Sequence, residues 1–325
     1  MIRTPVKKPL PVLSFPCVSL NGATVKELVY SSDLQAEGMK AVADRVPSAA
    51  SVSLMDLSVE AEAFGAAIRV SSDEVPTVPE AIVTDEDEAD ALTVPEVGAG
   101  RTGIYIDAIK KASALIKDRP VLAGIIGPFS LAGRLMDVTE IMVLCYDEPD
   151  MVHTVLAKAT EFLINYANAY KAAGANGVVV AEPLAGLLSP ALAAEFSHGY
   201  MKKLIDAVQT DDFAVIYHNC GNTVPLMKKD IYALGAMGYH FGDAIKMADM
   251  LDGAPEDVLV MGNVSPSAQF LCGTPESIRE ATLSIMKECC GNPNFVISSG
   301  CDIPPKSSWD NIDAFFAAAE EFYNQ

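Results

Sequence analysis

The chain has 325 residues and a mass of 34.5 kDa; half of its residues are apolar and a fifth are charged. This is a globular composition with enough apolar material for a buried core. Forty-three acidic residues against 23 Lys and Arg residues give a net charge of -20. That charge excludes nucleic acids and anionic membrane surfaces as partners bound by bulk charge, because both need a basic face.

No segment offers the roughly 20 consecutive apolar residues that a membrane-spanning helix needs. The uncharged stretch Pro120–Gly133, for example, has 14 residues and is interrupted by Gly124 and Pro128. No apolar run with a small-residue cleavage site follows Lys7 and Lys8, so the sequence indicates no secretory leader. We therefore expect a cytoplasmic protein.

Short apolar runs without helical period alternate along the chain with amphipathic stretches. Continuous runs of this kind are typical of parallel strands that are buried on both faces. An apolar stripe over Asp150–Ala173 predicts a long helix, and a last helix is expected from about Ser307 to Tyr323. The predicted strands, preceded by a weaker candidate at Pro11–Leu20, are Ala49–Leu54, Val121–Ile126, Gly177–Ala181, Phe213–Tyr217, Met237–His240, Val258–Met261 and Phe295–Ser298.

Eight candidate strands that alternate with helices favour a (β/α)8 TIM barrel formed by one domain, residues 1–325. A doubly wound sheet is the alternative, but no glycine-rich dinucleotide motif follows the first strand and no P-loop motif is present. One segment interrupts the alternation after the second predicted strand. Asp73–Gly100 holds nine acids and no Lys or Arg, which predicts an acidic insertion. It is either a solvated loop or a lid or docking face, since long loops in compact domains are often functional.

The seven cysteines are an odd number in a large chain and include no Cys-x-x-Cys, which argues against a disulfide framework. Free cysteines usually behave as small buried apolar residues. We expect this of five of them: Cys17, Cys145, Cys272, Cys289 and Cys290. Cys220 and Cys301 differ, because each lies just beyond a predicted strand.

The carboxyl ends of all strands of a barrel open on one face, where active sites lie. His218 and Cys220 directly follow one predicted strand, Cys301 follows the last, and Glu182 follows a third, so all four are expected at this mouth. Thiolate and imidazole are preferred zinc ligands, and three protein ligands with an open fourth position describe a catalytic site. The sequence therefore predicts zinc ligation by His218, Cys220 and Cys301. Glu182 is either a fourth, displaceable ligand or a carboxylate hydrogen-bonded to a loop.

Three further residues are weaker candidates for the same mouth. His240 ends a predicted strand and either contacts substrate as a catalytic residue or is a structural histidine. Asp56 follows the second predicted strand and is a candidate to orient substrate or cofactor. Asn263 is also a candidate for cofactor binding, although bracing of its own loop is the more ordinary role.

Six motifs give the chain a family resemblance that covers nearly its whole length. They are Met55–Gly65, Gly127–Ala132, Ala181–Gly186, His218–Gly221, Gly262–Pro266 and Gly300–Pro304. With them, the sequence resembles the uroporphyrinogen decarboxylase-like superfamily, specifically its zinc-dependent branch, which contains the methylcobalamin:coenzyme M methyltransferases. The His-x-Cys motif with a distant cysteine is the specific part, and the Gly-Pro and Gly-Asn motifs are shared across the superfamily.

This resemblance implies a barrel whose mouth binds Zn²⁺ and a small thiol, such as coenzyme M or homocysteine. It also implies a methylated corrinoid as methyl donor, supplied by methylcobalamin or a separate corrinoid-binding protein. Decarboxylases of the superfamily carry an Arg-rich segment near the N-terminus, whereas Phe15–Ala23 contains no Arg. Two alternatives stay open at this point: a decarboxylase-like lyase without metal, and a non-catalytic corrinoid-binding module.

Overall fold

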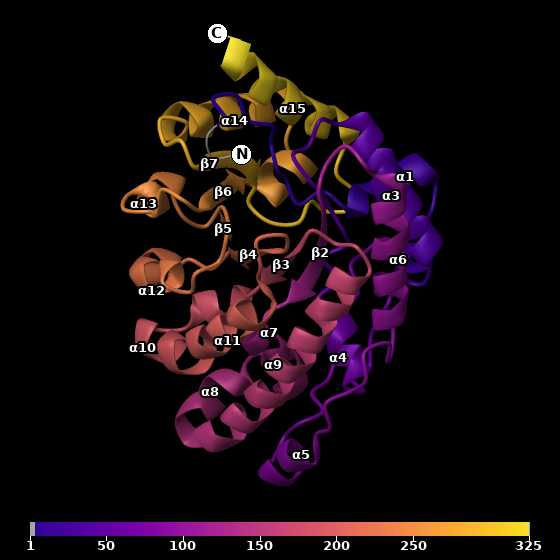
Figure 1. Cartoon of the computed structure of the whole chain (residues 1–325), viewed down its shortest axis with the longest axis vertical. Helices are drawn as coiled ribbons and strands as arrows, with labels where there is room; N and C mark the ends of the chain where they lie inside the picture. Colours follow the sequence, from indigo (N-terminus) through magenta and orange to yellow (C-terminus); the bar gives the residue numbers. More distant parts are fainter. Residues whose placement is uncertain (1–3, 325) are drawn as a thin grey trace.

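The computed structural model describes residues 4–324, so residues 1–3 and 325 of the predicted domain lie outside the described part. Within it, the strands form one sheet in which all neighbours are parallel and follow the order of the sequence. The sheet curls into a TIM-barrel-like half-barrel with helices around it (Figure 1). Because a doubly wound sheet would reverse its strand order at a switch point, that alternative is wrong. The strands are β1 (Ser51–Val52), β2 (Val121–Ile126), β3 (Gly177–Ala181), β4 (Ala214–Asn219), β5 (Gly238–Phe241), β6 (Leu259–Val264) and β7 (Phe295–Ser299).

Most of the helices lie in the segments that connect consecutive strands. The α-helices are α1 (Val18–Asn21), α2 (Val25–Val29), α3 (Ser32–Arg45), α4 (Val59–Ala63), α5 (Glu86–Ala91), α6 (Thr102–Leu115), α7 (Pro128–Met136), α8 (Glu140–Asp147), α9 (Pro149–Ala172), α10 (Pro190–Ala193), α11 (Gly199–Val208), α12 (Lys228–Tyr232), α13 (Met247–Leu251), α14 (Pro275–Cys289) and α15 (Trp309–Asn324). The 3-10 helices are η1 (Phe15–Cys17), η2 (Pro183–Leu187) and η4 (Val224–Met227), and the π-helices are η3 (Ala194–His198) and η5 (Pro266–Leu271). The predicted long helix and last helix are thus confirmed as α9 and α15.

The weaker strand predicted at the start of the chain is wrong, since η1 begins at Phe15 and α1 follows it from Val18. The extended residues before it nevertheless lie between the two edges of the sheet. Leu10 donates its N–H to the carbonyl of Ile297 in β7 at 3.0 Å, and Pro9 accepts a bond from Ala49, just before β1, at 2.8 Å. This segment therefore occupies the place that an eighth strand would take, without completing a strand ladder.

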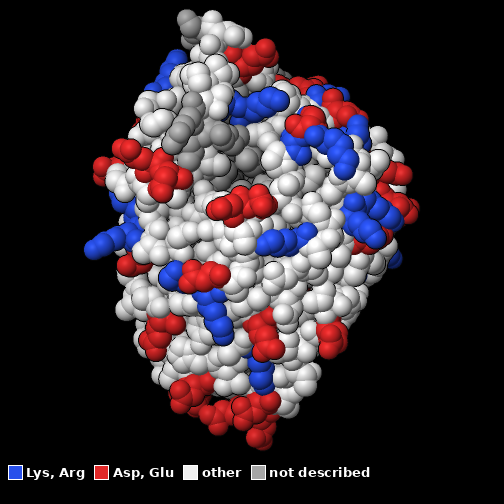
Figure 2. Space-filling view, viewed as in Figure 1, with Lys and Arg blue, Asp and Glu red and all other residues white. Residues whose placement is uncertain are grey.

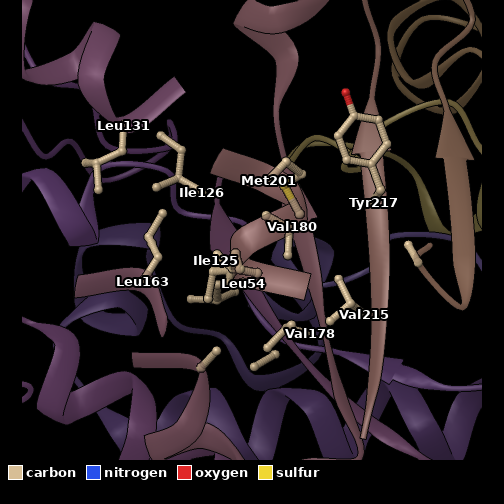
Figure 3. Close-up of a cluster of buried hydrophobic side chains, with 14 of the residues drawn as sticks. Leu54, Ile125, Ile126, Leu131, Leu163, Val178, Val180, Met201, Val215 and Tyr217 are labelled. Carbon is tan, nitrogen blue, oxygen red and sulfur yellow. The ribbon is translucent and has the colours of Figure 1, made fainter. Parts of the chain in front are cut away.

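Side chains of each strand alternate between two apolar clusters, as the pleat requires. In β4, Val215 and Tyr217 belong to the larger cluster, which the strands share with the helices, whereas Ile216 belongs to a smaller cluster inside the curl of the sheet. Figure 3 shows the larger cluster, where Leu163 of α9 and Met201 of α11 lie near the strand residues. Burial on both faces explains why the strands read as continuous apolar runs.

The inner face changes from apolar to polar toward the carboxyl ends of the strands. Two residues beyond Ile216 in β4 lies His218, and two residues beyond Val296 in β7 lies Ser298. Residues two apart on a strand share a face, so both polar side chains lie on the inner side, above the inner apolar cluster. The inner apolar cluster therefore lies directly below the expected site, toward the amino ends of the strands.

The acidic segment 73–100 is ordered against the rest of the molecule. It contains α5, whose N-cap Asp85 accepts a bond from the Glu88 amide, and Lys158 of α9 donates to the carbonyls of Ala89 and Asp90 at 2.7 Å each. Figure 2 shows acidic side chains gathered at the lower end of the molecule, where Figure 1 places α5. None of the helices in residues 4–324 is long and apolar enough to cross a membrane.

All seven cysteines are free thiols. Cys17, Cys145 and Cys289 are buried as predicted, and Cys290 is half-buried. The prediction for Cys272 is wrong, because this residue caps the carboxyl end of η5 and is exposed.

Asp56 lies in a buried network that ties the loop after β1 to α6. Its carboxylate accepts bonds from the Arg101 guanidinium, from the Tyr105 hydroxyl at 2.7 Å, and from the backbone and hydroxyl of Ser58. Arg101, only 2% exposed, also pairs with Glu62 at 2.6 Å. Asp56 therefore compensates a buried cation, and its predicted contact with substrate or cofactor stays a prediction.

Replacement of Asp56 by Asn should lower the free energy of unfolding by about 3 kcal/mol, because it leaves Arg101 buried with Glu62 as its remaining anionic partner. Urea denaturation measures this change. The matched control is Asp44→Asn, which breaks the exposed pair with Lys40 and should cost less than about 1 kcal/mol. Equal small losses in both variants would show that the buried network does not hold the fold.

Candidate metal centre

The register of the sheet brings two histidines together at the carboxyl ends of neighbouring strands. His218 of β4 is the direct partner of His240 of β5. Both point to the inner face and are almost fully buried, and their ring centroids lie 4.7 Å apart. Paired residues of neighbouring parallel strands point to the same face of the sheet. The register alone therefore brings these two side chains together.

The turn that carries Cys220 is fixed by the residue before it. The Asn219 side chain accepts a bond from the Gly221 amide at 2.9 Å and donates to the Tyr217 hydroxyl at 2.8 Å. Gly242, beyond β5, packs against this turn so closely that a Cβ there would lie 2.4 Å from the Cβ of Cys220. Only glycine fits at this position without moving the Cys220 backbone.

Cys301 reaches the same place from the end of β7. Gly300 donates its N–H to the carbonyl of Val264 at 2.7 Å, and a Cβ on Gly300 would lie 2.8 Å from the Asp243 amide. The loop after β7 thus packs closely against the loop after β5. As a result, the Cys301 sulfur lies 3.4 Å from Nε2 of His218.

One imidazole nitrogen and two sulfurs, from His218, Cys220 and Cys301, all lie within 4.8 Å of one another. Zinc bonds of about 2.0–2.3 Å in tetrahedral geometry place neighbouring ligand atoms about 3.3–3.8 Å apart. The 3.4 Å separation of the Cys301 sulfur and His218 Nε2 falls in that range. The donor set therefore fits Zn²⁺, and it is the one group of this kind among residues 4–324.

The two thiols are electrostatically coupled. A hydrogen bond between them raises the pKa of Cys220 and lowers the pKa of Cys301, so the pair favours a thiolate on Cys301. Burial opposes charge on both. A bound cation would draw the second proton off as well, since metal ligands must be deprotonated.

A chain of hydrogen bonds behind His218 fixes which of its nitrogens faces the thiols. The Ser298 hydroxyl donates to the carbonyl of Leu10 at 2.7 Å, so its oxygen must accept from Nε2 of His240, also at 2.7 Å. Nδ1 of His240 is then unprotonated and accepts from Nδ1 of His218 at 2.7 Å. Nδ1 of His218 also faces the carbonyl of His240 at 3.2 Å, which again requires a donor.

This chain leaves the lone pair of His218 Nε2 directed at the sulfurs, as a metal ligand needs. Burial and the neighbouring His218 lower the pKa of His240 well below its ordinary value, which agrees with a neutral ring. His240 therefore contacts His218 on its Nδ1 side, and both ring nitrogens of His240 make hydrogen bonds. Sequence reasoning missed Ser298, although its spacing from the apolar Val296 places it on the inner face.

The structure does not bring Glu182 to this group. Its carboxylate is fully buried and accepts bonds from the amides of Phe129 and Ser130, at 2.7 and 3.0 Å, and from the Ser197 hydroxyl at 3.2 Å. Burial raises the pKa of Glu182 to about 7, although these hydrogen bonds lower it. Ala181 points to the inner cluster, so the next side chain points to the opposite face and caps the start of α7.

Bracing of a loop was one of the two roles predicted for Asn263. The residue does brace a loop, but it is the loop after β5 and not its own. Its side-chain amide donates to the carbonyls of Gly242 and Ile245 at 2.9 and 2.8 Å. Both acceptors lie after β5, in the loop that packs against Cys220. Asn263 thus braces the loop whose Gly242 packs against Cys220.

Comparisons with known proteins show the family to which the chain belongs. The family model for uroporphyrinogen decarboxylase (URO-D) matches residues 15–322, so the chain belongs to that family. It is 27% identical to the methylcobamide:CoM methyltransferase MtbA of Methanosarcina acetivorans, over 82% of this chain and 78% of that protein. It is also 27% identical to a uroporphyrinogen decarboxylase of Aliivibrio salmonicida, over 86% and 81%. The solved structure of a methyltransferase from Methanosarcina mazei matches with a TM-score of 0.87 and 26% identity, covering 99% of this chain and 96% of that one.

Ser298→Ala should weaken zinc binding by about 10- to 100-fold, because His240 loses the acceptor that fixes the tautomer of His218. Competition with a chromophoric chelator measures the affinity, and circular dichroism checks the fold. Ser298→Thr keeps the hydroxyl and should restore most of the affinity. Wild-type affinity in the alanine variant would refute the role given to this chain of hydrogen bonds.

Proposed function

We propose that this member of the URO-D family is a zinc-dependent methyltransferase that moves a methyl group from a methylated corrinoid to a small thiol, such as coenzyme M or homocysteine. The observation that carries the proposal is the group of two thiols and one oriented imidazole at the mouth of the curled sheet. Similarity to a methylcobamide:CoM methyltransferase supports it. Identity alone does not decide the reaction, since a uroporphyrinogen decarboxylase is also 27% identical.

His218, Cys220 and Cys301 would hold the metal. Bound zinc would supply Lewis acidity that turns a weakly acidic thiol, with a pKa near 8.5, into a thiolate nucleophile at neutral pH. The two protein thiolates balance the charge of the divalent cation, so an added thiolate stays electron-rich. Three neutral histidines in their place would favour a bound hydroxide and hydrolysis.

We assign the fourth position of the centre to the substrate thiol. Glu182 as a ligand would have to leave three hydrogen bonds and cross to the opposite face of its strand. We propose instead that Glu182 holds α7 in place and that His240 positions His218. Asp56 and Asn263 then act through the loops that they brace.

Decarboxylation of uroporphyrinogen is less well supported. A tetrapyrrole with eight carboxylates requires several cations, but Phe15–Ala23 carries none. Among the described residues, the cavity beside the loop of Cys301 is lined by a single cationic side chain, Arg134. These charges suit a substrate with one anionic group.

A corrinoid-binding protein is the proposed partner at the mouth. Leu187 and Leu226, in the turns after β3 and β4, are 57% and 72% exposed. Leu187 follows Gly186, whose backbone packs against Gly221, the neighbour of Cys220. An apolar rim next to the metal ligands is a suitable surface for a protein that brings in the methyl donor. We propose that residues 1–325 act as one unit, with the acidic insertion 73–100 within it.

The first test is metal content. Protein purified without chelator should carry about one zinc per chain, and Cys220→Ser and Cys301→Ser should each lose most of it together with methylcobalamin:thiol turnover. Cys272→Ser, at an exposed cysteine, is the matched control and should keep both. Zinc at wild-type level in both ligand variants would refute the assigned centre. Chelation should abolish turnover but preserve the circular dichroism spectrum, because the core does not depend on the metal.

The second test concerns the partner. Leu187→Asp and Leu226→Asp should slow methyl transfer from a corrinoid protein about tenfold or more, because a charge in an apolar contact opposes docking. Turnover with free methylcobalamin should stay near the wild-type rate. Leu115→Asp, at an exposed leucine near the amino end of β2, is the control and should change neither rate. Equal losses with both donors would exclude a docking role for the rim.

A further inference from the structure

Two accessible thiols, those of Cys220 and Cys301, come together at the carboxyl ends of β4 and β7. Their sulfurs lie within 4.8 Å of each other, although β5, β6 and β7 separate the two residues in the chain. Both side chains are half-exposed, so a small molecule can reach either sulfur. Thiols at this separation are able to react with each other as well as with a metal ion.

The backbone around both sulfurs is held by the same loop, the one after β5. Gly242 of this loop packs against Cys220 so closely that a Cβ on Gly242 would meet the Cys220 backbone. The next residue, Asp243, packs against Gly300 in the same way. Cys220 and Cys301 therefore cannot move apart without opening a close contact to this shared loop.

The gap between the two sulfurs is small enough for side-chain movement to close. An S–S bond is about 2.0 Å long, so the sulfurs must approach by less than about 3 Å. A change of one χ1 rotamer moves a sulfur by a distance of this order. Cys289, the last residue of α14, and the adjacent Cys290 are the contrast. Successive side chains of a helix project about 100° apart, so that pair is poorly placed to join.

We propose that Cys220 and Cys301 are a site of reversible oxidation, at which hydrogen peroxide converts the two thiols into one disulfide. Cysteines that respond to oxidants commonly lie next to a second, resolving cysteine. The resolving thiol captures the sulfenic acid of the first before irreversible oxidation to the sulfinic acid. This inference rests on the metal centre of the proposed function but not on its methyl transfer.

The reaction consumes one peroxide for each disulfide. The sulfur of one cysteine attacks a peroxide oxygen: an S–O bond forms, the O–O bond breaks, and the departing hydroxide takes the thiol proton and leaves as water. The sulfur of the other cysteine then attacks this sulfenic acid. The S–S bond forms, the S–O bond breaks, and a second water leaves with the other thiol proton. The sulfurs lose two electrons, which the peroxide oxygens gain, and a dithiol reverses the change by thiol–disulfide exchange.

The disulfide and a metal ion exclude each other at this site. Metal ligation by cysteine requires the thiolate, and a disulfide sulfur has lost that charge. Oxidation would therefore leave His218 as the one intact ligand of the three. Conversely, thiolates that hold Zn²⁺ share their lone pairs with the cation and should react with peroxide more slowly. The site should thus be oxidised when it holds no metal and protected when it does.

Peptide mapping without reduction tests the site directly. The full chain is treated with an equimolar amount of hydrogen peroxide in the presence of a chelator, blocked with N-ethylmaleimide and digested. We expect one product that links Cys220 to Cys301, and two fewer free thiols than the seven of the untreated chain. Cys290→Ser is the matched control and should give the same product, whereas Cys220→Ser should not. Circular dichroism checks the fold of each sample.

The second readout is zinc affinity, measured with a chromophoric chelator on the reduced, the oxidised and the re-reduced chain. Oxidation should weaken zinc binding about 100-fold or more, dithiothreitol should restore it, and prior loading with zinc should slow disulfide formation about tenfold or more.

An unchanged thiol count after peroxide, a link between other cysteines, or sulfinic acid in place of the link would overturn the inference. A reduced chain that binds zinc but forms no disulfide would refute the oxidation site and leave the metal centre standing. A chain that forms the disulfide but binds no zinc when reduced would support the oxidation site and refute the metal centre.

Discussion

The hydrogen bond from the Ser298 hydroxyl to the carbonyl of Leu10 fixes the tautomers of the two buried histidines, His240 and His218. A carbonyl can only accept, so every later bond in the chain through His240 to His218 has one possible direction. The bond also joins β7 to the extended segment that takes the place of an eighth strand. The contact that links the two edges of the sheet therefore also orients His218.

The centre depends on strand alternation as much as on residue type. His218, His240 and Ser298 each lie on the inner face of the sheet, above the inner apolar cluster. Glu182 also follows a strand, but it comes one residue after the inward-facing Ala181 and therefore points to the other face. There its carboxylate accepts bonds from the first amides of α7. The strand ends thus carry the candidate metal ligands on one face and, at Glu182, a contact to α7 on the other.

Much of this arrangement could be predicted from the sequence, because continuous apolar runs identify buried parallel strands and the carboxyl ends of such strands meet on one face. His218, Cys220 and Cys301 were predicted together for that reason, and the structure brings them together. The candidate at Pro11–Leu20 failed because Pro16 favours the first turn of a helix.

The places of the acidic residues were harder to predict, although the signal was present. Met55 and Ala181 belong to the inner cluster, so the acids that follow them, Asp56 and Glu182, point to the other face. Arg101, the partner of Asp56, is 45 residues away in the sequence, and no local pattern connects the two.

The bond between Leu10 and Ser298 spans 288 residues, nearly the full length of the chain. During synthesis on the ribosome, the first participant emerges almost at the start and the second almost at the end. Nascent chains shorter than this hold His218 and Cys220 without the group that orients the imidazole and without Cys301. The three residues of the candidate metal centre can therefore come together only when nearly the whole chain has been made, and any metal that they hold would enter after that point.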